Sequence, residues 1–276
     1  MSTLPLSNRP DLARSIPKPR IPALAQVDDQ VINVANQEDA IRFCMRSLRA
    51  GRGFTLFTLN LDHLVTLRSD PSFRAVYARA TFVTADGAPV ARLARRSYAH
   101  VERTTGADLV TPLAGAAAFE RLPVYLFGAS EATLNKAAEK LKQQYPNLII
   151  AGMEAPPRGF DPMGEAADLA ADRIARSGAR ICFVALGAPK QEFFGDRMAQ
   201  RHPHIGWLGI GAALDFIAGE KSRAPRLLQR IGLEWFWRLM QEPRRLGLRY
   251  LRCAMLLARL SLHHEEAPVA PARIAR

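Results

Sequence analysis

The strongest constraint on the fold is the regular alternation of apolar and helical segments in the second half of the sequence. Residues 123–130, 179–192 and 204–216 each begin with an apolar run, pass through a glycine turn and lead into a helical pattern. Residues 131–145 and 164–178 have the periodicity of amphipathic helices. Strands that alternate with helices of about 12–15 residues are joined by right-handed crossovers and run parallel. We therefore expect an α/β fold with a Rossmann-like parallel sheet flanked by helices.

The first half of the chain shows the same alternation less regularly. Asn36 is a suitable N-cap for a first helix, and Gly51 is a suitable stop. Pro71 suits the first turn of a helix, so it should start a second helix within the helical stretch that ends near residue 79. We further expect helices at 37–50 and 107–120 and strands at 54–59, 81–87 and 147–152.

The net charge of +12 is concentrated near the C-terminus. Residues 221–260 carry a surplus of +8, whereas residues 28–220 carry only +1. Two helices are predicted at 227–241 and 243–262, and the arginines of the second lie mostly on one side, which makes it cationic and amphipathic. We therefore divide the chain into a flexible N-terminal arm at 1–27, an α/β core at 28–220, a basic amphipathic helical appendage at 221–262 and a disordered tail at 263–276.

The composition disfavours several classes of protein. Apolar residues make up 48% of the chain, which is too many for a disordered protein. The three cysteines form no CxxC or zinc motif, so we expect a reduced, cytoplasmic protein. The sequence has no run of about 18 uncharged apolar residues, and prolines interrupt its N-terminal segment, so neither a membrane-spanning helix nor a signal peptide is predicted. The six histidines form no metal-binding motif.

Short polar or glycine-containing motifs follow five of the expected strands. In open parallel sheets, ligands bind beyond the C-terminal ends of the strands. Glycine lets a phosphate approach the backbone, and the following helix offers free N–H donors, so a phosphorylated or nucleotide ligand would fit. The same glycines are also common as plain turn residues. The motifs are Thr58–Asn60, Asp86–Gly87, Gly128–Ser130, Gly187–Gln191 and Gly209–Gly211.

Asp86 is the candidate for acid–base chemistry. Its carboxylate either accepts a proton from a substrate hydroxyl or caps the following helix. Thr58 and Asn60 either position a sugar hydroxyl or serve as cap and turn residues. Gln191, beside Lys190 at a helix start, is a candidate for holding a sugar or phosphate. The chain contains no GxGxxG, Walker A or GxSxG motif, which disfavours dinucleotide-binding, P-loop and α/β-hydrolase functions.

Together these motifs resemble those of the WecG/TagA/CpsF family of bacterial glycosyltransferases. The resemblance runs from about Gln37 to Tyr250 and leaves out both ends of the chain. One departure is Ala85, where relatives usually carry Pro, and another is Ala129, where a second Gly is common. The matching motifs are T-x-N (Thr58, Asn60), DG (Asp86, Gly87), R-x-x-G-x-D (Arg103, Gly106, Asp108), GAPKQE (187–192), G-x-G-x-x-x-D-F-x-A-G (209–219), RAP (223–225) and residues 232–250.

The resemblance implies an inverting glycosyltransferase, hexosyltransferase or N-acetylmannosaminyltransferase-like, that needs no metal and no other cofactor. It would move a sugar from a UDP-sugar to a polyprenyl-diphosphate-linked glycan in exopolysaccharide or cell-envelope polysaccharide biosynthesis. Asp86 matches the catalytic base of the family, and Thr58 and Asn60 match residues that line the catalytic site. The expected substrate-binding residues are Arg103, Asp108, Gly128, Gly187, Pro189, Lys190, Gln191, Glu192, Gly211, Asp215, Arg223, Arg238 and Arg245.

The resemblance also implies that the appendage closes over the site and meets an anionic membrane surface. We therefore expect a cytoplasmic protein attached peripherally to the inner face of the cell membrane. The arginines of the appendage would then neutralise a diphosphate, because a guanidinium matches phosphate oxygens.

Two other classes of function remain as alternatives. A nucleotide-sugar-binding regulator without turnover would need no base at Asp86. A nucleic-acid-binding module would use the basic appendage with Trp235 and Trp237, but the near-neutral core disfavours it, and we expect no nucleic acid as partner. Both tryptophans would equally suit a membrane interface or domain packing. N-acetylmannosamine, its uronic acid and glucose stay open as the donated sugar, and a homo-oligomer is compatible with the sequence.

Overall fold

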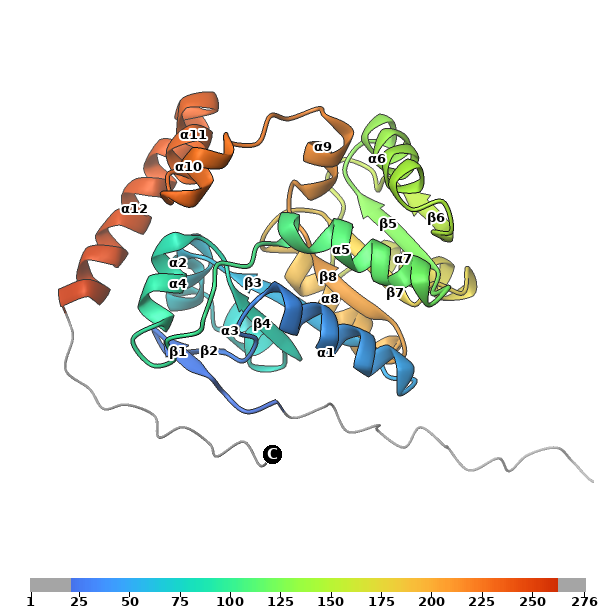
Figure 1. The fold of residues 1–276 in the computed structure, drawn as a ribbon, viewed down its shortest axis with the longest axis horizontal. Coiled ribbons are helices and arrows are strands. Elements are labelled where there is room, and N and C mark those ends of the chain that lie inside the picture. Colours follow the sequence, from blue (N-terminus) through green and yellow to red (C-terminus); the bar gives the residue numbers. More distant parts are fainter. Residues whose placement is uncertain (1–20, 263–276) are drawn as a thin grey trace, which may run out of the picture.

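The fold is built around a six-stranded sheet in which all neighbouring strands run parallel. The computed structural model describes residues 21–262, except for the side chains of Arg226, Arg230 and Arg245. The strand order is β4-β3-β8-β7-β5-β6, which confirms the expected Rossmann-like arrangement (Figure 1). The strands are β3 (Phe54–Leu59), β4 (Phe82–Ala85), β5 (Val124–Gly128), β6 (Ile150–Glu154), β7 (Ile181–Ala185) and β8 (Gly206–Gly209).

Helices cover both faces of this sheet. Their apolar sides form one large buried cluster on one face and two smaller clusters on the other. The first face carries α1 (Gln37–Arg49), α5 (Gly106–Phe119), α6 (Glu131–Gln144) and α9 (Ala213–Ala218). The second face carries α2 (Leu61–Ser69), α3 (Pro71–Ala78), α7 (Glu165–Arg176) and α8 (Lys190–Arg201).

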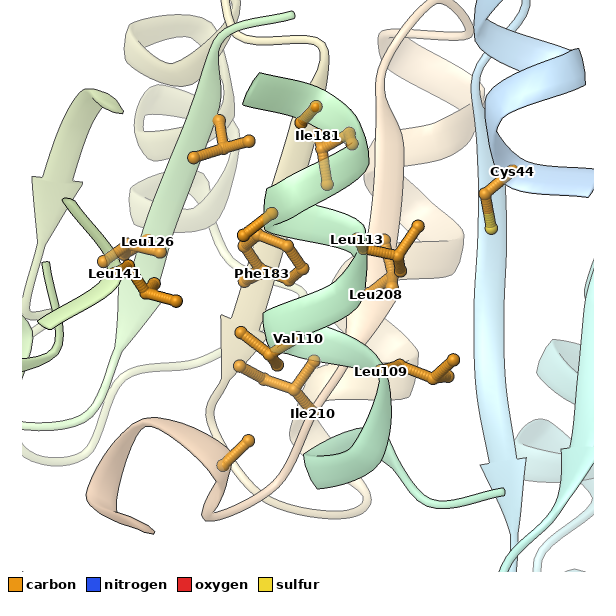
Figure 2. Close-up of a cluster of buried hydrophobic side chains, with 14 of the residues drawn as sticks. Cys44, Leu109, Val110, Leu113, Leu126, Leu141, Ile181, Phe183, Leu208 and Ile210 are labelled. Atoms are coloured by element: carbon orange, nitrogen blue, oxygen red, sulfur yellow. The ribbon is translucent and has the colours of Figure 1, made fainter. Parts of the chain in front are cut away.

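The large cluster is centred where α5 crosses the sheet (Figure 2). Leu109, Val110 and Leu113 on α5 belong to this cluster together with Phe183 on β7 and Leu208 on β8, and all five are fully buried. Because the central strands are buried on both faces, their sequences are almost continuously apolar rather than alternating. This explains why apolar runs, and not a two-residue period, marked the strands in the sequence.

Local sequence signals placed most helix starts correctly. The side chain of Asn36 accepts a hydrogen bond from the backbone N–H of Asp39 and caps α1, and Pro71 lies in the first turn of α3. The strand expected at 147–152 lies later, at β6. The single helix expected at 227–241 is divided into α10 (Arg226–Arg230) and α11 (Glu234–Gln241). The division lies at Gly232, whose φ of +79° favours glycine and interrupts a right-handed helix.

A short antiparallel hairpin precedes α1 and was not predicted. Its strands are β1 (Ala25–Val27) and β2 (Gln30–Ile32), and the side chain of Asn33 after it donates to the carbonyl of Thr81 and accepts from the N–H of Val83 on β4. Since Ala25 and Val27 are buried, residues 25–27 pack on the core rather than belonging to the expected arm. The remainder of that arm up to residue 20 and the expected tail at 263–276 lie outside the described residues.

The C-terminal appendage consists of α10, α11 and α12 (Pro243–Leu262) and lies at one side of the sheet, beyond α2 and α4 (Ala88–Ala94) (Figure 1). The helix α12 packs against α2, and its Leu256 joins the buried cluster of that face. The carboxylate of Asp62 on α2 forms an ion pair with Arg249 on α12, at 3.4 Å. Among residues 21–262, no helix is both long enough and apolar enough to cross a membrane.

Candidate active site

The predicted site residues meet at the C-terminal edge of the sheet, beside β3 and β8. These strands are neighbours, but the helices that follow them leave toward opposite faces, α2 toward one and α9 toward the other. Such a divergence opens a crevice at the strand ends of a doubly wound sheet. Thr58 and Asn60 at the end of β3 and Gly211 after β8 border this crevice, and Asp86 follows the adjacent strand β4.

The carboxylate of Asp86 points toward the end of β3. Its Oδ2 accepts a hydrogen bond from the buried hydroxyl of Thr58 at 3.1 Å, and its backbone N–H donates to the carbonyl of Leu59 at 2.8 Å. No side chain caps α4, so Asp86 does not serve as the helix cap that its position also allowed. Thr58 and Asp86, which are 28 residues apart in sequence, therefore form one unit.

Burial is the main influence on the acidity of Asp86. It raises the pKa of this carboxyl to about 6, against the opposing effects of Arg238, the Thr58 hydroxyl and Arg103. Glu234 adds to the rise by repulsion. Since a carboxylate of higher pKa is a stronger base and is still mostly ionised at pH 7, Asp86 is suited to accept a proton.

Asn60 combines a structural and an open polar group. Its Oδ1 accepts a hydrogen bond from the backbone N–H of His63 at 2.9 Å and so caps α2. Within the described residues, the side-chain NH2 of Asn60 makes no hydrogen bond. The sequence offered capping and substrate positioning as alternatives for Asn60; the structure supports capping, and substrate contact stays a prediction.

Gln191 and Glu192 at the start of α8 are buried beneath the crevice. The Gln191 amide donates to Glu192 Oε1 at 2.8 Å, and its oxygen accepts from the backbone N–H of Gly211 at 2.9 Å. Both functional atoms of Gln191 are thus used in holding the turn after β8 against α8. Both residues were expected to contact substrate; that role stays a prediction, and in this structure their polar groups bond to the protein.

Two buried residues that the sequence did not single out complete this polar layer. The ring of His63 lies 2.6 Å from the Tyr77 hydroxyl through Nδ1 and 4.0 Å from Glu192 Oε1 through Nε2. Burial raises the pKa of Glu192 to about 7 and, together with the nearby Arg249, lowers the pKa of His63 to about 4. The sequence signal was weak, because a histidine and a tyrosine on apolar helix faces are usually read as core.

An ion-pair network joins the core to the appendage at the same edge. Asp108, which also caps α5 in a capping box with Thr105, pairs with Arg223 at 2.7 Å and with Arg103 at 3.3 Å. Glu234 on α11 lies 3.4 Å from each of the same two arginines. Three of these four residues were predicted from sequence. Glu234 was missed because only the fold brings α11 beside Arg103.

The other predicted residues lie around this centre. The guanidinium of Arg238 lies over the ring of Phe216, 5.6 Å from its centroid, and Asp215 pairs with Lys221 at 3.1 Å. The amine of Lys190 donates to the carbonyl of Phe160, at 2.9 Å. Arg245 belongs to α12, but its side chain lies outside the described part of the structure. Gly187 and Pro189 form the turn between β7 and α8.

Gly128 is required by the backbone rather than by a ligand. Its φ is +100°, and a Cβ at this position would lie 2.6 Å from the carbonyl carbon of Ala185 on the next strand. Any other residue would therefore push β5 and β7 apart at the edge where the site lies.

The arrangement combines one general base with several cations. Arg103 and Arg238 are close enough to lower the pKa of Asp86, and Arg223 lies beside Arg103 in the ion-pair network. Within residues 21–262, no group of three or more His, Cys, Asp and Glu side chains is placed to hold a metal ion. These residues can deprotonate a hydroxyl next to a site that attracts an anion such as a diphosphate.

A comparison with protein families gives an independent result. The model of the family described as "Glycosyl transferase WecG/TagA/CpsF family" matches residues 25–267. The match begins at β1 and includes the whole sheet, the strand-end residues and all three helices of the appendage.

Proposed function

The chain belongs to the WecG/TagA/CpsF family of glycosyl transferases, and from this premise we propose that it moves a sugar from a UDP-sugar to a polyprenyl-diphosphate-linked glycan. The product would serve exopolysaccharide or cell-envelope polysaccharide biosynthesis. The observation that carries the proposal is Asp86, a carboxylate of raised pKa at a strand end, bonded to Thr58 and near Arg103 and Arg238.

The proposed reaction is a single displacement that inverts the anomeric carbon. Asp86 accepts the proton of the acceptor hydroxyl while its oxygen forms the new bond to the anomeric carbon. The bond from that carbon to the diphosphate of UDP breaks, and UDP leaves with the electron pair. Thr58 holds the carboxylate of Asp86 in place through its 3.1 Å hydrogen bond.

In this proposal, arginines neutralise the leaving diphosphate. Arg103, Arg223 and Arg238 come from two different parts of the chain and meet at the site. A guanidinium can bind phosphate oxygens through two parallel hydrogen bonds. Arg103 and Arg223 currently face the carboxylate of Glu234, so an incoming diphosphate would take over the position of that carboxylate.

The appendage is the proposed site of membrane attachment at the cytoplasmic face. It exposes nine large apolar side chains, an unusual number for so short a segment. On α12, four of them fall within about 60° of one another at 100° per residue, and Arg252 and Arg259 follow within about 40°. An apolar stripe bordered by arginines is typical of a helix that lies in an anionic membrane surface. The four side chains are Leu248, Leu251, Met255 and Leu262.

The catalytic proposal is tested with Asp86→Asn. This variant should lose sugar transfer from a UDP-sugar panel to a lipid-diphosphate-linked acceptor, because an amide cannot take the proton. Binding of UDP, measured by calorimetry, should stay close to that of the wild type. Glu165→Gln makes the same chemical change at an exposed position on α7 and should retain full activity. Wild-type turnover by Asp86→Asn would refute the assignment of Asp86 as the catalytic base. A separate measurement, the activity of the wild type after addition of EDTA, tests whether a metal ion contributes.

The membrane proposal is tested with Leu248→Gln/Leu251→Gln/Met255→Gln. The triple variant should lose binding to vesicles containing phosphatidylglycerol, because the apolar stripe would no longer partition into the bilayer. A matched triple change of exposed apolar residues on the core, Met153→Gln/Met163→Gln/Leu169→Gln, should bind as the wild type does. Equal binding by both triple variants would show that the appendage does not attach the protein to membranes.

A further inference from the structure

A cavity of about 600 Å³ lies between α4 and the appendage. Ala88 and Arg92 on α4 form one wall, Arg103 contributes a second side, and Gln229 and Ile231 at the end of α10 form the opposite wall. Ala88 is only two residues from Asp86, so the cavity begins next to the proposed base. Of the residues that line the cavity, only Arg103 has a proposed role in binding the donor diphosphate.

The appendage touches α4 closely at one point beside the cavity. A Cβ added to Gly232 would lie 2.7 Å from the Cβ of Ala88, so only glycine allows this approach. The contact borders the cavity, because Ala88 and Ile231 both line it. The wall formed by Gln229 and Ile231 is therefore held in a defined position relative to the arginines of α4.

The cavity is strongly cationic. Arg92, Arg95 and Arg103 line it, and none of the described residues that line it is acidic. Within the described part of the chain, Arg92 has no hydrogen-bond or ion-pair partner. The Nε of Arg95 donates to the carbonyl of Val101 at 2.7 Å, which fixes the side chain and leaves its terminal nitrogens available. Arg103 has only long contacts, at 3.3 Å and 3.4 Å, with Asp108 and Glu234.

The opposite wall has the reverse character. Ile231 is 57% exposed although it lines the cavity, and Leu227, one turn earlier on α10, is 69% exposed. Exposed aliphatic side chains beside arginines that keep nitrogens available suit a ligand with a charged head and a hydrocarbon chain. A nucleotide, whose polar ribose and base would lie against Ile231, suits this wall less well.

We propose that this cavity binds the diphosphate of an isoprenoid-diphosphate acceptor, with Arg92 and Arg95 as its principal ligands and the isoprenoid chain along Ile231 and Leu227. The inference rests on the proposed function and assigns the acceptor its own site. The strand β4 is the edge strand of the sheet, and α4, which carries Arg92, follows it directly after Asp86. An acceptor hydroxyl beside Asp86 would then attack the anomeric carbon on the face opposite the leaving UDP, as an inverting displacement requires.

The test measures binding of farnesyl diphosphate below its micellar concentration by calorimetry. Arg92→Gln should weaken binding about tenfold, and Arg92→Gln/Arg95→Gln about a hundredfold, since each removes a charge-assisted contact with phosphate. Ile231→Ser should weaken binding of farnesyl diphosphate but leave binding of inorganic pyrophosphate unchanged. Arg176→Gln, which removes an exposed arginine of α7 at the opposite edge of the sheet, is the matched control and should bind as the wild type does.

Steady-state kinetics separate this inference from the proposed function. In the double variant, the KM for the lipid-linked acceptor should rise while the KM for the UDP-sugar stays unchanged. Unchanged farnesyl diphosphate binding by Arg92→Gln, which has no partner to lose and so should fold normally, would overturn the inference even if the wild type transfers sugar. The inference would also be overturned if the arginine variants lost binding to phosphatidylglycerol vesicles but kept binding of farnesyl diphosphate. That result would show that the arginines bind lipid headgroups. Arginine-dependent farnesyl diphosphate binding in a wild type that transfers no sugar would refute the function and leave the cavity as a lipid-diphosphate site.

Discussion

The site geometry predicts that the rate of sugar transfer depends on pH through the ionisation of Asp86. Substitution of three neighbours, Thr58, Glu234 and Arg238, should shift this pH dependence in directions that the structure defines. With a pKa of about 6, the carboxyl is mostly ionised at pH 7 and mostly protonated at pH 5. If Asp86 is the base, kcat/KM should fall about tenfold between these two pH values, because only the ionised form accepts a proton. The phosphates of the lipid-linked substrate also titrate. The profile is therefore measured with several acceptors, so that the pKa of these phosphates can be distinguished from the pKa of Asp86.

The substitutions then act in opposite directions. Arg238→Gln and Thr58→Val each remove an influence that lowers the pKa of Asp86, so the acidic limb of the profile should move to higher pH. Glu234→Gln removes a repulsion that raises the pKa, so the limb should move to lower pH. The Thr58 hydroxyl is buried and bonded at 3.1 Å, and a hydrogen bond to a charged group contributes about 1.5–3 kcal/mol, so its effect should be easily measured.

The assay is the pH profile of kcat/KM from pH 4.5 to 9 at constant ionic strength, with Glu165→Gln as the control variant. A profile without an acidic limb near pH 6, or a limb that moves the same way in Arg238→Gln and Glu234→Gln, would refute the assignment of Asp86 as the base. A limb that stays in place in all three variants would show that the titrating group lies elsewhere.

The remaining predictions concern stability and the appendage. Burial raises the pKa of Glu192 from 4.5 to about 7, so the folded state loses about 3 kcal/mol of stability as pH rises from below 4.5 to above 7. Glu192→Gln removes this loss, so in thermal denaturation it should gain stability relative to the wild type at pH 8 and much less at pH 4.5. Gly232→Ala should separate the appendage from Ala88, because the added Cβ would be 2.7 Å away, and should increase proteolysis near residue 232 while leaving the melting temperature of the core unchanged. Leu208→Ala should reduce the free energy of unfolding by about 2–5 kcal/mol in urea titrations, since this fully buried side chain lies at the centre of the main cluster.

The sheet could be predicted from the sequence because its signals are local. Apolar runs followed by glycine mark strands that are buried on both faces, and caps such as Asn36 mark helix starts. The hairpin β1–β2 has strands of three residues, which are too short for a periodic pattern, and its burial depends on contacts with β4. Its existence is decided by tertiary packing, which the sequence alone does not display.

The site was predictable to the extent that its residues end strands. Thr58 and Asp86 follow neighbouring strands, and parallel neighbours bring their ends to one edge. The partners supplied by helices were not predictable in the same way. Glu234 reaches Arg103 across 131 residues, and His63 reaches Glu192 across the packing of α2 on the sheet. Such contacts depend on the angles between helices and on how the appendage docks, for which the sequence contains no short signal.

The packing of α12 on α2 links the appendage mechanically to the edge of the crevice. The helix α2 begins at the cap formed by Asn60, at the edge of the crevice, and holds α12 through Leu256 and the Asp62–Arg249 pair. A force or tilt applied to α12 by a bilayer would thus be transmitted along one short helix to the strand end that carries Thr58. We therefore expect interfacial kinetics: the rate should depend on the density of acceptor in the lipid surface and on the lateral pressure of that surface, not only on concentrations in solution.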